Sequence, residues 1–111
     1  MDVIDGLGAL AQETRLDIVR LLVRRGVDGA AAGEIALKIG VPSATLTFHL
    51  NILTDAGLLV RRRSSRNVIY RANFARLQRM TGYLLENCCA EENCAAAANE
   101  VGDGGHRRKS G

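Results

Sequence analysis

The chain has 111 residues, the size of a single domain, and its composition, 47% hydrophobic and 24% charged, is that of a globular protein. With two Phe, two Tyr and no Trp, it must fill its core with Leu, Ile, Val and Ala, which favours helices. No apolar run approaches a membrane span and the first residues, MDVID, are acidic, so the sequence predicts a cytoplasmic protein with no signal peptide and no membrane partner.

The first half of the chain is predicted to be helical. Apolar residues recur at helical spacing over about 3–10, 14–25 and 34–39. Gly26 is the expected stop of the second helix. After a tight turn at 40–42, a further helix is expected over 43–56, with Ser43 as its N-cap directly after Pro42.

The period of the pattern changes after Gly57. Residues 58–63 (LLVRRR) and 68–72 (VIYRA) predict two short strands, joined by a hairpin turn at 64–67. A last helix is expected over 73–87. The predicted architecture is mainly α with a small β-hairpin, a winged helix-turn-helix domain over 1–94, followed by a disordered tail over 95–111.

The helix over 43–56 is expected to have a core face and a DNA face. Leu46, Leu50 and Leu53 recur at i, i+4 and i+7 and must face the core. The residues expected to contact DNA are Ser43, Ala44, Thr45, Thr47, Phe48 and Asn51. Small polar side chains at a helix N-terminus can reach base edges. Phe48 either touches thymine methyl groups or tilts into the core edge, and His49 is expected to be a packed, hydrogen-bonded residue.

The charge of the chain is concentrated. Arg107, Arg108 and Lys109 account for the net charge of +3. Residues 61–79 hold seven arginines and no acid, and residues 86–103 hold five acids and no base. The arginines expected at the hairpin, for contact with phosphates or a minor groove, are Arg61, Arg62, Arg63 and Arg66. A solvated surface loop is the alternative, but a basic hairpin directly after a helix-turn-helix favours DNA.

The segment SATLTFHLNILTDAGLLVRRRSSRNVIYR, residues 43–71, resembles the helix-turn-helix and wing of the ArsR/SmtB family of bacterial metal-responsive repressors. The matching features are the hydroxyl-x-His-Leu element at 47–50, AGL at 56–58 and R-x-V-x-Y at 66–70. The stretch LGALAQETRLDIVRLL, residues 7–22, is similar to the family's N-terminal stretch. The resemblance covers about residues 4–90. It implies binding to double-stranded operator DNA as a homodimer paired through the first and last helices.

All three cysteines, Cys88, Cys89 and Cys94, lie within seven residues near the C-terminus. In a reducing cytosol, clustered thiols favour metal binding or reactivity over structural disulfides. Three soft sulfur ligands suit As(III) or Sb(III), which bind three sulfurs in a pyramid, whereas Zn(II) usually takes four ligands. Cd(II) and Pb(II) are further alternatives.

The position of these cysteines resembles that in an arsenic-responsive subgroup of the family, with a vicinal pair and a third cysteine at the C-terminus. The Cys-Val-Cys element of other arsenic sensors and the His and Asp ligands of zinc and nickel sensors are absent from the matching positions. On a regular helix Cys88 and Cys94 would point about 240° apart, so binding of one ion requires the end of the last helix to loop back or unwind.

The sequence therefore predicts a repressor that leaves its operator when As(III) or Sb(III) binds Cys88, Cys89 and Cys94. The seam expected to pair the subunits on the last helix is Phe74, Leu77, Thr81 and Leu84. The main alternative keeps the fold and makes oxidation the signal, with Cys88 or Cys89 bonded to Cys94. A thiol enzyme, such as a small arsenate reductase, is not expected, because no arginine follows any cysteine at the spacing of a phosphatase loop.

Overall fold

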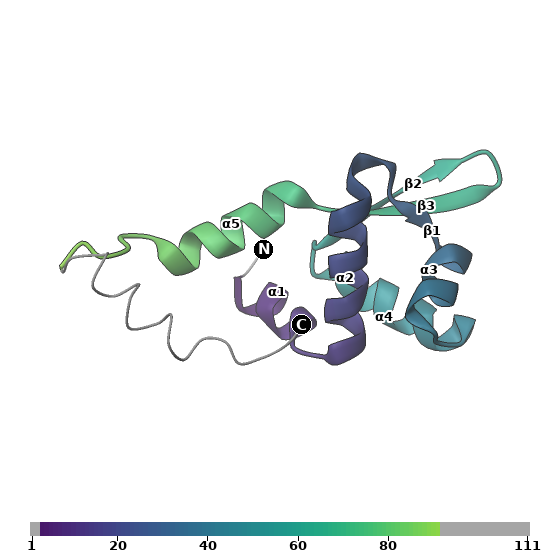
Figure 1. Cartoon of the computed structure of the whole chain (residues 1–111), viewed down its shortest axis with the longest axis horizontal. Helices are drawn as coiled ribbons and strands as arrows, with labels where there is room; N and C mark the ends of the chain where they lie inside the picture. The colour runs from purple at the N-terminus through teal and green to yellow at the C-terminus, as the bar shows by residue number, and fades with distance from the viewer. Residues whose placement is uncertain (1–2, 92–111) are drawn as a thin grey trace. The chain divides into compact units, whose positions relative to one another are not determined.

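The computed structural model describes residues 3–91 (Figure 1). The chain divides into two compact units, Met1–Thr81 and Gly82–Gly111. The elements in chain order are α1 (Val3–Leu10), α2 (Glu13–Arg25), the 3-10 turn η1 (Gly26–Asp28), β1 (Ala30–Ala31), α3 (Ala32–Ile39), α4 (Ser43–Asp55), β2 (Leu59–Ser64), β3 (Asn67–Ala72) and α5 (Phe74–Leu85). Cys94 and the predicted tail lie outside the described residues.

Helices α1 and α2 follow the predicted pattern. The bounds of α1 agree with the prediction, and α2 begins one residue earlier than expected, at Glu13. The side chain of Gln12 caps α2 by accepting a hydrogen bond from the backbone N–H of Arg15 at 2.9 Å. Gly26, with φ of 68°, ends the helix, and its N–H donates to the carbonyl of Leu22. The predicted stop is confirmed.

The segment between α2 and α3 holds a strand that the sequence did not predict. β1 pairs antiparallel with β3, with Ala30 opposite Tyr70 and Ala31 opposite Ile69, so the sheet has three strands in the order β1-β3-β2. Gly29 precedes this strand with φ of 62°, and a side chain there would collide with the carbonyl of Tyr70. Helix α3 then starts at Ala32 rather than at residue 34.

The predicted cap of α4 is wrong. Pro42, with φ of −64° and ψ of 154°, occupies the N-cap position, and Ser43 is the first helical residue. The carbonyl of Ser43 instead accepts a hydrogen bond from Oγ1 of Thr47 at 3.0 Å. The helix ends at Asp55, one residue before the predicted end. Pro42 takes this role because its ring fixes φ while its extended ψ turns the chain into the helix.

The predicted hairpin forms from β2 and β3, which pair from Leu59 opposite Ala72 to Ser64 opposite Asn67. The connection is a two-residue loop, and its first residue, Ser65, has φ of 54°. A positive φ at the first loop position matches the right-handed twist of a hairpin. In Figure 1 the closed end of this hairpin extends beyond the helices of the first unit.

The core of the first unit is made of aliphatic side chains, as the composition predicts. Leu46, Leu50 and Leu53 of α4 are at most 1% exposed, which confirms the predicted core face. They belong to one cluster with Ile18 and Leu22 of α2. Ile35 of α3 and Leu59 of β2 belong to the same cluster, with further buried residues from α1, β1, β3 and α5.

Helix α5 is shorter than predicted, and its apolar seam is divided. Phe74 and Leu77 pack against the core of the first unit, and Met80 is only 2% exposed. Thr81 and Leu84 are exposed. The sequence predicts that a second subunit covers the whole seam. This prediction is wrong for the first half of the seam, because Phe74 and Leu77 pack against the chain's own core. Among the residues from 3 to 91, no helix combines the length and apolarity needed to cross a membrane.

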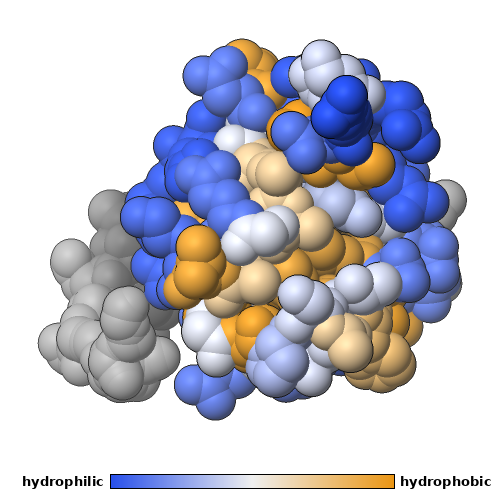
Figure 2. Space-filling view, turned by 90° about the vertical axis from the view of Figure 1, so that its right-hand side faces the viewer, coloured by the Kyte–Doolittle hydropathy of each residue, from blue (hydrophilic) through white to orange (hydrophobic). Residues whose placement is uncertain are grey.

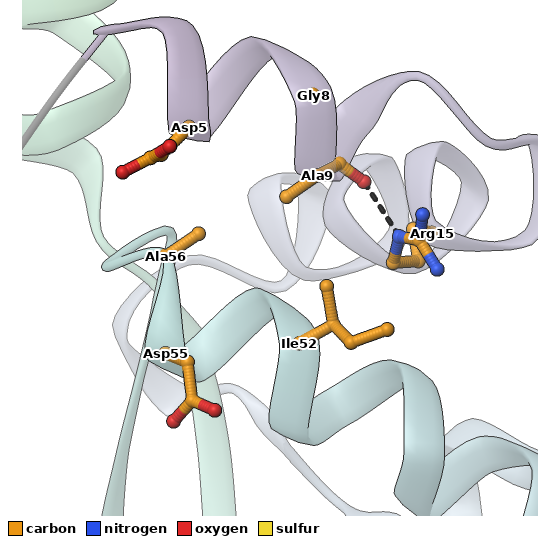
Figure 3. A pocket seen from close by; sticks show the side chains of 7 residues that line it. All are labelled: Asp5, Gly8, Ala9, Arg15, Ile52, Asp55 and Ala56. Atoms are coloured by element: carbon orange, nitrogen blue, oxygen red, sulfur yellow. Dashed lines mark hydrogen bonds between the residues drawn. The ribbon is translucent and has the colours of Figure 1, made fainter.

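An arginine–histidine contact joins α4 to α1 and α2. Nη1 of Arg15, on α2, lies 3.1 Å from Nδ1 of His49, on α4, and Nε of Arg15 donates to the carbonyl of Ala9 at 2.7 Å. Figure 3 shows Arg15 beside an open hollow of about 420 Å³ between α1 and α4, with Ile52 on the opposite wall. His49 is 8% exposed, so the prediction of a packed, hydrogen-bonded histidine is confirmed.

The environment of His49 keeps its ring neutral. Burial, and after it the positive charge of Arg15, lower the pKa of His49. A neutral ring can accept the Arg15 hydrogen bond at Nδ1, whereas a protonated ring would place two cations in contact.

We expect Leu50→Ala to lower the free energy of unfolding by about 2–5 kcal/mol, because it leaves a cavity under α4. Leu37→Ala is the matched control, since Leu37 is 86% exposed on α3 and its loss should change stability by less than about 0.5 kcal/mol. Urea unfolding measures both variants. Equal losses would contradict the assignment of Leu50 to the core.

We also expect the stability of the protein to fall as the pH is lowered. The unfolded chain binds a proton at His49 below about pH 6.5, whereas the folded chain resists it. The contribution is therefore complete above that pH and is lost as the pH falls through the lowered pKa. In His49→Gln, which keeps a side-chain acceptor but does not titrate, urea midpoints at pH 7.5 and 5.5 should lie closer together than in the wild type. An identical pH dependence would refute the prediction.

Candidate functional site

The residues predicted to face DNA on α4 all lie on the surface. Ser43, Ala44, Thr45, Thr47, Phe48 and Asn51 are exposed, and the leucines behind them are buried. Phe48 does not tilt into the core, because 59% of it is exposed. Its ring meets the ring of His49 edge-on, with centroids 5.3 Å apart and planes at 67°. Arg15 contacts His49, and the ring of His49 in turn packs against the ring of Phe48.

The four hairpin arginines are also exposed, at the end of the sheet away from the core. Side chains alternate along a strand, so Arg61 and Arg63 lie on the face of β2 that carries buried Leu59, and Arg62 lies on the other face. Arg66 is the second residue of the turn. The positive charges therefore surround the hairpin tip rather than line one face.

Figure 2 views the molecule from the right-hand side of Figure 1, the side of the hairpin tip and α3. Hydrophilic residues surround a region of apolar and near-neutral residues on this face. An exposed polar helix face followed by exposed arginines suits a nucleic-acid groove, where base edges lie between charged backbones.

The structure brings together two of the three predicted sulfur ligands. α5 ends at Leu85, and residues 86–89 form turns in which Asn87 and Cys89 both have φ of 61°. The backbone thus leaves the helix before the cysteines, and the reshaping of this segment by a bound ion stays a prediction. Sγ of Cys88 lies 3.5 Å from Sγ of Cys89. Cys88 is exposed and Cys89 is half-buried.

The geometry of this pair fits a shared ion. A thiolate sulfur lies about 2.3 Å from a bound zinc ion, so two sulfurs on one ion of that size can be at most about 4.6 Å apart. The observed 3.5 Å meets this limit. Cys89 is disulfide-bonded in the structure, so capture of an ion requires its reduction. Within residues 3–91 no group of three or more His, Cys, Asp or Glu side chains forms a metal site.

Two contacts that position α4, those of Arg15 and Asn73, are not predicted by any local sequence pattern. Arg15 belongs to the ETR triplet at the start of α2. From the sequence alone, this arginine would be assigned to the surface. Asn73 precedes α5, and its side-chain nitrogen donates to the carbonyl of Gly57 at 2.9 Å. Because Asn73 precedes a helix, the sequence could have identified it as a helix cap. It could not have predicted the second hydrogen bond, to the carbonyl of Gly57.

Known proteins resemble this chain in sequence. A family model described as "Helix-turn-helix domain" matches residues 10–62. The "Biofilm growth-associated repressor" of Xylella fastidiosa (strain 9a5c) is 29% identical over 89 residues, which cover 80% of this chain and 75% of that protein. The family-model match runs from the end of α1 into β2 and so includes the exposed polar face of α4 and the first hairpin arginines.

Two solved structures show the same architecture. An "ArsR-like Transcriptional Regulator" from Rhodococcus sp. RHA1 has a TM-score of 0.68 at 25% identity, covering 96% of this chain and 94% of that chain. The "transcriptional repressor BigR" from Xylella fastidiosa has a TM-score of 0.61 at 28% identity, covering 80% and 88%. These relatives are transcriptional regulators rather than enzymes, as the sequence predicts. The chain shares the winged helix-turn-helix fold of these regulators.

Proposed function

We propose that the chain is a homodimeric transcriptional repressor that binds double-stranded operator DNA and leaves it when As(III) or Sb(III) binds Cys88, Cys89 and Cys94. The observation that carries the DNA-binding part is the exposed polar face of α4, followed directly by a hairpin with four exposed arginines. The names of the relatives as repressors and regulators support the same part.

On DNA, α4 acts as the recognition helix. Its N-terminal residues enter the major groove, where the hydroxyl groups of Thr45 and Thr47 and the amide of Asn51 bind base edges. Thr47 Oγ1 donates within the helix to Ser43, so it meets DNA as an acceptor. The exposed ring of Phe48 suits thymine methyl groups. The hairpin arginines bind the neighbouring phosphates or enter the minor groove.

Dimerisation is proposed from apolar side chains that the chain leaves uncovered. In the second half of α5, Tyr83, Leu84 and Leu85 are 61%, 59% and 65% exposed, and Ile4 of α1 is 70% exposed. Large exposed apolar side chains mark sites of association. The family resemblance implies pairing through these same two helices. A two-fold pair presents its recognition helices about 34 Å apart, one turn of DNA.

The inducer site is proposed from the cysteine pair. Their sulfurs are close enough to share an ion, and the turn at 86–89 frees this segment from helical geometry. Cys94, outside the described residues, supplies the third sulfur of the pyramid. A bound ion adds strong bonds between residues 88 and 94, so it favours whichever conformation of the C-terminal segment brings the sulfurs together.

A second function, release by oxidation, is favoured by a specific observation. Cys89 is disulfide-bonded in the structure, so an oxidised form of the segment is compatible with the fold. The two proposals share the DNA-binding surface and differ only in the signal. Titration of the reduced protein–operator complex separates them: arsenite under strong reductant releases DNA if the ion is the signal, and peroxide alone does so if oxidation is.

We expect Arg63→Ala and Arg66→Ala to weaken operator binding and to reduce the slope of log K against log salt by about one for each phosphate that is no longer neutralised. Arg79→Ala is the control, because Arg79 is equally charged and exposed on α5. Fluorescence anisotropy at several salt concentrations measures the slopes. Wild-type slopes in both hairpin variants would remove the wing from the DNA-binding surface.

We expect Cys89→Ser to keep operator affinity and to lose release by arsenite, because one of three sulfur ligands is gone while α4 and the hairpin are unchanged. Arsenite titration, followed by thiol–metal absorbance and operator anisotropy together, measures both properties. Ser64→Ala is a control for an oxygen-bearing side chain away from the segment. Normal release of the Cys89 variant by arsenite would refute the ligand assignment.

A further inference from the structure

The recognition helix, the wing and α5 meet at one junction. α4 ends at Asp55 and β2 starts at Leu59, while β3 ends at Ala72 and α5 starts at Phe74. Asn73 stands between the last two elements and contacts the connection between the first two. Its backbone N–H donates to the carbonyl of Leu58 at 2.8 Å, and its side-chain Nδ2 donates to the carbonyl of Gly57 at 2.9 Å.

The same side chain also starts α5. Oδ1 of Asn73 accepts from the backbone N–H of Arg76 at 3.2 Å, and the Asn73 carbonyl accepts from Leu77 at 3.0 Å. One amide group therefore holds two elements: its oxygen caps α5 and its nitrogen holds the end of α4. Only a side chain with both a donor and an acceptor can make the two bonds together.

Two neighbouring contacts make this junction stiff. A Cβ built on Gly57, which has φ of 81°, would lie 2.7 Å from Nη1 of Arg76, so the Arg76 guanidinium lies against the glycine at the end of α4. A cation there also suits the negative end of a helix. One turn further along α5, Met80 is buried against Gly6 of α1. The start of α5 thus cannot move without disturbing residues 57 and 58.

We propose that Asn73 is the positioning residue through which a change in the thiol segment reaches the recognition helix. The inference rests on the proposed function, in which the segment after α5 receives the signal. α5 is continuous from Phe74 to Leu85, three residues before Cys88. A displacement of α5 moves the residues at its start first. The Asn73 Nδ2–Gly57 hydrogen bond then transmits this movement to the end of α4.

The test uses the full-length protein with two substitutions at position 73. Asn73→Asp keeps an acceptor oxygen for the α5 cap but loses the donor to Gly57. Asn73→Ser keeps a capping oxygen but is too short to reach Gly57. Gln78→Glu is the matched control, because it makes the same change from amide to carboxylate at an exposed position on α5. Thermal unfolding confirms that each variant is folded.

The quantity to measure is the release ratio, the operator Kd with saturating arsenite under strong reductant divided by the Kd without it. Arsenite affinity is measured separately, by thiol–metal absorbance in the absence of DNA. Couplings of this kind are typically about 5–150-fold. We expect both Asn73 variants to bind arsenite as the wild type does but to lose most of the release ratio, while Gln78→Glu keeps it. A merely structural role would lower stability without changing this ratio.

The outcomes separate this inference from the function on which it rests. A wild-type release ratio in both Asn73 variants would overturn the role of Asn73 and leave the proposed repressor intact. If peroxide and not arsenite releases the wild type, the same ratios measured with peroxide decide the role of Asn73. If neither agent releases the wild type, the proposed signal is wrong, and the coupling role falls with it.

Discussion

The burial of one leucine stripe on α4 determines what this protein presents to DNA. Leu46, Leu50 and Leu53 are almost fully buried, and each such side chain stabilises the fold by about 1.5–3 kcal/mol relative to exposure. Because successive residues on a helix are about 100° apart, rotation of α4 by even one position would withdraw these leucines from the core. The polar residues on the opposite side are exposed as a consequence.

Polar contacts refine this arrangement in the middle of the helix and just beyond its C-terminal end. Arg15 binds the carbonyl at the end of α1 and reaches His49 in the middle of α4, which in turn supports the ring of Phe48. Beyond the end of α4, Asn73 binds the turn that follows it. Apolar burial sets the rotation of the recognition helix, and these directional bonds set its position along and across the core.

The thiol segment differs physically from the surface that reads DNA. The first unit is held by buried aliphatic contacts, whereas residues 86–91 are turns and bends with mostly exposed side chains. A bound ion or a new disulfide can therefore change this segment without opening the core. The first turns of α5 are packed against the core of the first unit, and its residues from Thr81 to Leu85 are exposed.

The sequence by itself determined the helices, the hairpin and the two faces of α4, because these depend on the spacing of side chains along a single element. It also placed the hairpin arginines and the three cysteines. Only the tertiary structure decided the features that need a distant partner. β1 has two residues, too few to show a period, and exists because Ala30 and Ala31 pair with Tyr70 and Ile69.

The same limit applies within the site. An arginine at the start of α2 carries no local sign that it will meet His49, which lies 34 positions later. The apolar stripe of α5 is regular along its length, yet the core of the chain covers Phe74 and Leu77 and leaves Leu84 exposed. Periodicity predicts that a helix has an apolar face. Which part of that face the chain covers depends on where the other elements end in space, and no local pattern encodes that.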